Sequence, residues 1–171
     1  MRSTPFVIVL ALFAVITLLT LTPNPVRCQE RVLMTEELAR RADVIVVAKV
    51  TMLKSEWTSD KSRIYTNVTL SIDQQLKGDG NETSMTISTL GGEVGGVGEV
   101  YSHLPRFKLN EQVVVFAEKD RNGQLQVLGG NEGKLVVMNE ESTGRQLVAN
   151  SESLEIFTSR VRSIVQAQRQ K

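Results

Sequence analysis

The pattern of apolar and polar positions predicts mostly β-structure beyond residue 43. Val44–Val50 is a nearly continuous β-branched run that continues toward Trp57, which is typical of a strand buried on both faces. In Ile64–Ile72 apolar residues alternate with polar ones, which indicates a strand with one buried face. Shorter apolar segments predict further strands or short pairings at 85–87, 113–117, 125–128, 135–138 and Leu147.

Glycine, asparagine and aspartate mark the turns between these strands. Asn122-Gly123 lies between two apolar runs and is the strongest hairpin signal, because both residues tolerate positive φ. Turns are also predicted at 58–62 and 77–81. Gly91–Asn110 follows no regular period, so we expect a long irregular segment there.

One helix is predicted at each end of the β-structure. Thr35 can cap a short helix with acidic residues in its first turn and Arg40 and Arg41 in its last, which complements the helix dipole. Near the C-terminus apolar residues recur at helical spacing, with Ser153 as the predicted cap. We expect this stripe to pack on the β-structure, although it could instead dock on a partner or a membrane surface. Its members are Leu154, Phe157, Val161 and Ile164.

Short strands separated by glycine-rich turns are typical of a small barrel or sandwich. The order of a long first strand, a hairpin partner, a third strand, a broad loop and a final hairpin favours a mainly β fold. We expect a small five-stranded Greek-key barrel of the OB type with a short N-terminal helix and a C-terminal amphipathic helix. The predicted division is a signal peptide at 1–28, the OB-like barrel at 29–149 and the packed helix at 150–171.

The first 28 residues have the pattern of an export signal. Arg2 precedes an almost unbroken apolar run, Phe6–Leu21, and two prolines follow before a polar segment opens at Gln29. The run falls somewhat short of the roughly 20 residues that a membrane-spanning helix needs. We therefore expect a cleaved signal peptide and a periplasmic or extracellular protein; a membrane anchor formed by residues 6–22 is the alternative.

Charge and cysteine content narrow the classes of function. Of the 20 basic residues, Arg2 and Arg27 would leave with the signal, so 18 would face 19 acidic residues and the net charge would be about −1. Aromatic residues are few and are not interleaved with lysine or arginine, so no nucleic-acid partner is expected. The one cysteine is Cys28, so the domain that follows it cannot contain an internal disulfide.

The sequence lacks the familiar catalytic and cofactor motifs. His103 is the one histidine, which excludes a zinc site built from several histidines, and no G-x-S-x-G motif occurs. Gly129–Lys134 resembles a phosphate-binding loop, but Leu128 and Leu135 occupy positions that such a loop needs for glycine and for serine or threonine. Gly91–Gly98 lacks the dinucleotide-binding spacing. We therefore expect neither an enzyme nor a bound cofactor or metal.

The glycine-rich segment is the candidate binding loop. Its glycines allow a wide bend, and binding residues are often found on such loops. The alternative is that the glycines only shape the bend, and that His103 is a loop residue that packs or bonds to the backbone. The candidate residues lie in this loop or at its edge: Gly95, Gly96, Tyr101, His103, Arg106 and Phe107.

Two N-glycosylation sequons begin at Asn67 and Asn81. Both asparagines fall at positions expected to be exposed. The sequons have a consequence only in a source that glycosylates exported proteins.

Three segments carry a resemblance to a known family: ADVIVVAKV, IYTNVTLSIDQQLKGD and GGEVGGVGEVYSHLPRFKLNEQVVVF. They resemble an exported bacterial domain, without an assigned activity, that occurs alone or ahead of matrixin-type metalloprotease domains. The resemblance covers Leu33 to about Met138 and implies a barrel similar to the netrin-like fold of the tissue inhibitors of metalloproteinases. Those inhibitors present a mature N-terminal cysteine to the protease zinc. Cys28 lacks a second cysteine to fix it, so zinc chelation is not expected.

Three hypotheses about function follow. The first is an exported, non-enzymatic binding or accessory module that engages a protein partner, such as a secreted metalloprotease or a cell-envelope protein. The second is a hydrolase with its site around His103. The third is a membrane-tethered structural protein that keeps residues 1–28, the one case in which a membrane partner is expected.

Overall fold

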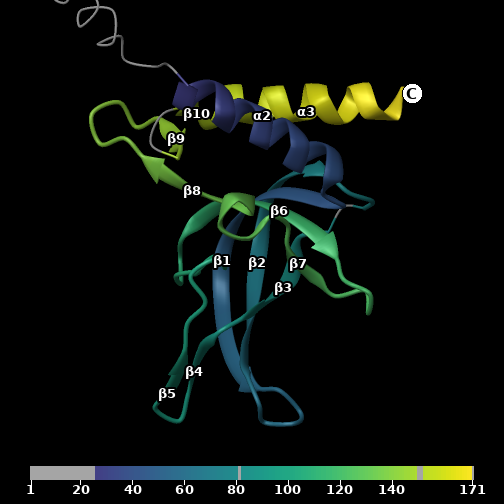
Figure 1. The fold of residues 1–171 in the computed structure, drawn as a ribbon. Helices are drawn as coiled ribbons and strands as arrows, with labels where there is room; N and C mark the ends of the chain where they lie inside the picture. The colour runs from purple at the N-terminus through teal and green to yellow at the C-terminus, as the bar shows by residue number, and fades with distance from the viewer. Residues whose placement is uncertain (1–25, 81, 150–151, 171) are drawn as a thin grey trace, which may run out of the picture. The chain divides into compact units, whose positions relative to one another are not determined.

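An antiparallel β-sheet dominates the computed structural model (Figure 1). The structure describes residues 26–80, 82–149 and 152–170, with side chains described from Met34 onward. The predicted signal peptide therefore lies outside the described residues, apart from 26–28, and so does the sequon asparagine Asn81. Among the helices that are described, none is both long enough and apolar enough to cross a membrane.

Ten strands and two α-helices are present in this part of the chain. The helices are α2 (Val26–Arg41) and α3 (Leu154–Arg169), and a 3₁₀ helix, η1, spans Gly130–Gly133. The strands are β1 (Val44–Trp57), β2 (Ile64–Lys77), β3 (Ser84–Leu90), β4 (Gly92–Val94), β5 (Val97–Glu99), β6 (Gln112–Lys119), β7 (Leu125–Val127), β8 (Lys134–Asn139), β9 (Gln146–Val148) and β10 (Glu152–Ser153).

The main sheet has the order β10-β9-β8-β6-β1-β2-β3, and β7 pairs with the second half of β6. The strands β4 and β5 form a separate hairpin. The predicted mainly β fold is therefore confirmed, but the predicted five-stranded closed barrel is wrong. Across the described residues β3 and β7 lie close together without pairing, so the sheet does not close. Strand β7 has three residues and pairs with β6 along one edge, and in the part of the chain that the structure describes its other edge forms no ladder with β3.

Two apolar cores lie on opposite faces of the sheet. Along β1, Ile45 and Val47 belong to one core, whereas Val46, Ala48 and Val50 belong to the other. Strand β6 alternates in the same way, so both central strands are buried on both faces. The prediction of a strand buried on both faces is confirmed.

The C-terminal helix packs on the sheet, as its apolar stripe predicts. Phe157 of α3 lies edge-on to Phe116 of β6, with ring centroids 6.5 Å apart, in the first of the two cores. The end of α2 lies beside α3, where Gln168 Nε2 donates to the carbonyl of Arg40 (Figure 1). Ser153 occupies the capping position of α3, but its side chain makes no capping hydrogen bond.

The predicted start of the first helix is wrong. Thr35 is not its cap, because α2 already begins at Val26 and Thr35 is a buried residue within it. Residues 27–34 contain neither glycine nor proline, so nothing in the chain interrupts the helix before Thr35. The basic residues of its last turn are placed as predicted, and Arg41 pairs with Glu37 at 3.2 Å.

The segment predicted to be irregular contains the β4–β5 hairpin. Its turn is Gly95-Gly96, whose φ values of 62° and 82° are those of a tight hairpin turn with two residues at positive φ. The pattern missed the hairpin because each strand has three residues, too few for an alternation to stand out. The Asn122-Gly123 hairpin joins β6 to β7 as predicted.

Candidate binding cleft

A cleft of about 350 Å³ lies between the sheet and the glycine-rich segment. The sheet side is formed by residues of β1, β2 and the end of β3, and the other side by the hairpin and residues 100–107. Pockets that hold small ligands or single side chains begin at roughly this size, about 300 Å³.

Hydroxyl groups form the polar part of the cleft on the sheet side. Ser55 and Thr66 are cross-strand neighbours in β1 and β2, with their hydroxyl oxygens 2.8 Å apart. Thr66 Oγ1 donates to the carbonyl of Gly91 at 2.7 Å, so Ser55 is the donor between the two hydroxyls. A Cβ atom on Gly92 would lie 2.3 Å from Thr66 Oγ1. Gly92 therefore lets the hairpin approach the sheet, which no larger residue would allow.

Glu99 connects the hairpin to the sheet. Its Oε2 atom accepts hydrogen bonds from the backbone N–H of Ile64 at 2.9 Å and from the hydroxyl of Tyr101 at 3.3 Å. Glu99 is half-buried and lines the cleft. These two neutral donors fix the orientation of its carboxylate.

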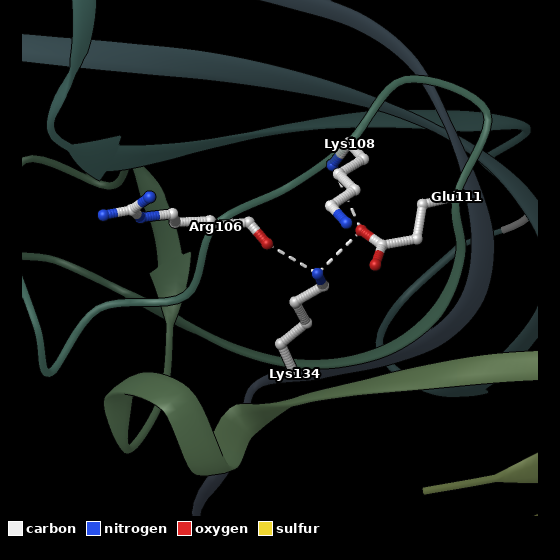
Figure 2. Close-up of polar contacts among 4 residues, drawn as sticks. All are labelled: Arg106, Lys108, Glu111 and Lys134. Carbon is white, nitrogen blue, oxygen red and sulfur yellow. Dashed lines mark hydrogen bonds and ion pairs between the residues drawn. The ribbon is translucent and has the colours of Figure 1, made fainter. Parts of the chain in front are cut away.

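A buried ion pair fixes the other wall of the cleft. Lys134 Nζ lies 2.7 Å from Glu111 Oε2 and donates to the carbonyl of Arg106 at 2.6 Å (Figure 2). The same carboxylate oxygen accepts the backbone N–H of Lys108 at 3.1 Å. The ammonium group also lies 4.8 Å from the ring centroid of Phe107. The segment 106–108 is thus held on β8 by one cation and one carboxylate.

The structure brings three of the six predicted site residues to the cleft. Tyr101, Arg106 and Phe107 line it. Gly95 and Gly96 lie at the exposed tip of the hairpin and are not among the lining residues. His103 is exposed and also lies outside the lining.

His103 is in a turn that packs against η1. Its ring lies edge-on to Tyr101, with centroids 6.3 Å apart, and its carbonyl accepts the backbone N–H of Asn131 at 3.1 Å. Among the described side chains, no carboxylate or hydroxyl is hydrogen-bonded to its imidazole. In the same part of the chain, no three His, Cys, Asp or Glu side chains are grouped as a metal site would require.

Sequence reasoning missed several residues of the cleft, including Ser55, Thr66 and Glu99. Thr66 carried a signal, because it stands between Ile64 and Val68 on the apolar face of β2. A polar residue at such a position needs a partner or faces a cavity. No local sequence pattern points to Glu99, because its hydrogen-bond partners lie on another strand and in a loop.

In comparisons with known proteins, neither a family model nor a curated sequence matches this chain. The family suggested by the three resembling segments therefore stays a hypothesis.

Proposed function

We propose that this chain is an exported, non-enzymatic binding module that engages a protein partner through the cleft. The observation that carries the proposal is the exposure of apolar side chains along the cleft. Leu53, Leu90 and Val100 all line it, and they are 37%, 36% and 64% exposed. Apolar side chains gathered around a concave site are typical of an interaction surface.

The cleft is also held in shape before any partner arrives. The Lys134–Glu111 pair holds one wall, and the hydrogen bond from Thr66 Oγ1 to the carbonyl of Gly91 holds the start of the hairpin against the sheet. A fixed site loses little conformational entropy on binding. These contacts support a preformed binding site.

An extended polypeptide fits this site better than a compact ligand does. Strand β1 pairs with β6 as far as Lys49, and the loop at Asn110 and Glu111 bonds to Val50. Beyond Val50, within the described residues, β1 pairs with β2 alone. Leu53 belongs to this part of β1, which is paired along one edge, and it lines the cleft. A strand with a free edge can accept an added strand, while a neighbouring pocket receives one of its side chains.

Export and the class of partner rest on the sequence. The apolar leader supports secretion to the periplasm or beyond the cell, and the resembling segments suggest a secreted metalloprotease or a cell-envelope protein as partner. The mass of the exported protein tests the first point. Loss of residues 1–28 is the expected result, and their retention would indicate the membrane-anchored alternative.

Peptide selection tests the binding site. Peptides are selected from a random library on the exported protein, and their binding is then measured to Val100→Gln and to the matched control Ile156→Gln. Val100 and Ile156 are 64% and 62% exposed, but Ile156 lies on α3, outside the cleft. Val100→Gln is expected to weaken binding about tenfold or more, because it places a neutral amide in the apolar contact, whereas Ile156→Gln leaves binding unchanged. Equal binding by both variants would overturn the proposal.

A further inference from the structure

The charged groups of the cleft do not neutralise one another. Glu93, Glu99 and Arg106 line it, which leaves one more acidic than basic group. Among the described residues, no ion pair is formed by Glu99, although Arg106 lines the same cleft. The guanidinium of Arg106 extends away from the Lys134–Glu111 pair in Figure 2.

The carboxylate of Glu99 is therefore oriented but not neutralised. Both of its hydrogen-bond donors, the Ile64 N–H and the Tyr101 hydroxyl, are neutral, and both bond to the same oxygen, Oε2. A half-buried carboxylate has lost part of its hydration, which costs free energy. A cation that hydrogen-bonds to it compensates for this cost better than a neutral donor does. The unpaired anion beside the apolar side chains of the cleft thus favours a ligand with a positive charge.

We propose that the cleft binds a lysine or arginine side chain of an extended polypeptide partner, with the cationic group on Glu99. This inference rests on the proposed function and names the chemistry of the partner. The aliphatic part of such a side chain matches the apolar lining at Leu90 and Val100. Its charged end reaches the carboxylate beside the ring of Tyr101, which lines the same cleft.

The competing explanation is that Glu99 only anchors the hairpin through its two hydrogen bonds. Glu99→Gln separates the two roles, because the amide oxygen still accepts from Ile64 and Tyr101 while the charge is gone. Glu155→Gln is the matched control, since Glu155 is an exposed carboxylate on α3, outside the cleft. If Glu99 only anchors the hairpin, Glu99→Gln should leave peptide binding unchanged.

The experiment uses the exported protein and the peptides that Val100→Gln fails to bind. Each peptide is compared with a derivative in which its lysine or arginine is replaced by norleucine. We expect every such peptide to contain a basic residue, and the norleucine derivative to bind about tenfold more weakly or worse. Glu99→Gln is expected to lose that preference with an unchanged thermal midpoint, whereas Glu155→Gln keeps it.

The two proposals fail in different ways. If the peptides bind in the cleft but lack a basic residue, or tolerate norleucine, this inference is overturned and the proposed function stands. If no selected peptide depends on Val100, the proposed function fails and this inference fails with it. Should Glu99→Gln not fold, the norleucine comparison still decides, because it leaves the protein unaltered.

Discussion

Lys134 Nζ lies 2.7 Å from Glu111 Oε2, and only 7% and 14% of the two side chains is exposed. Lys134→Met removes the cation and leaves the carboxylate buried with the backbone N–H of Lys108 as its remaining donor. We expect the free energy of unfolding to fall by about 3 kcal/mol, because an uncompensated buried charge is costly. Urea unfolding followed by circular dichroism measures the change. A loss below about 1 kcal/mol would contradict the expectation.

The double variant Lys134→Met with Glu111→Leu is the control for this pair. Removing both charges leaves no buried ion, so much of the lost stability is expected to return. In both variants the segment 106–108 loses its anchor, because the carbonyl of Arg106 no longer accepts a hydrogen bond from the ammonium group. Peptide binding in the cleft should therefore stay weaker than in the wild type even where stability recovers.

Two glycines of the hairpin are expected to respond differently to alanine. A Cβ on Gly92 would lie 2.3 Å from Thr66 Oγ1 and 2.5 Å from Ser55 Oγ, at a φ of 137°. At Gly98 the nearest atom would be 3.8 Å away. Gly92→Ala should cost about 2 kcal/mol or more and displace the hairpin, whereas Gly98→Ala should cost less than about 0.5 kcal/mol. Thermal unfolding and the amide spectra of the two variants provide the comparison.

Much of the sheet could be predicted because its signals are local. The β-branched run Val44–Val50 and the alternation in Ile64–Ile72 identify β1 and β2, and Asn122-Gly123 identifies the β6–β7 hairpin. The strands that were missed have too few residues to show a period: β4, β5 and β10 have three, three and two. Closure of a barrel depends on pairing between β3 and β7, which no local pattern reports.

The candidate site was predicted only in part, for a similar reason. The predicted binding loop includes three residues that line the cleft, because they follow the glycine-rich segment in the chain: Tyr101, Arg106 and Phe107. Glu111 and Lys134 are 23 residues apart, one just before β6 and the other at the start of β8, so only the fold brings them together. The imidazole makes His103 a candidate site residue, but in the fold this residue is exposed to solvent.

Lys77 joins β2 to the ends of both helices. Its Nζ atom donates to the carbonyls of Ala39 and Arg40, each at 2.9 Å, and to Gln168 Oε1 at 3.2 Å. Lys77→Met keeps the aliphatic stem and removes all three bonds, so we expect a loss of about 1–2 kcal/mol. Hydrogen exchange should show faster opening at the end of α2. An unchanged exchange rate there would mean that water replaces the ammonium group at no cost.

Asp60 is expected to titrate well below an ordinary aspartate. Its carboxylate accepts from Thr58 Oγ1 at 2.5 Å and from Ser62 Oγ at 2.8 Å, and these bonds, with the backbone N–H of Ser62, lower its pKa from 3.8 to about 2. Because the pKa is lower in the folded state, the stabilising contribution is complete above about pH 4 and is lost as the pH falls through about 2.

The measurement for Asp60 combines an NMR titration with two variants. In the wild type the carboxyl resonance should move with a midpoint near 2, and in Thr58→Val, which removes the largest cause, the midpoint should return toward 3.8. Asp60→Asn removes the titrating group, so its difference in stability from the wild type should be larger at about pH 5 than at about pH 2. A wild-type midpoint at 3.8 would show that the turn does not hold the carboxylate in the way that its hydrogen bonds indicate.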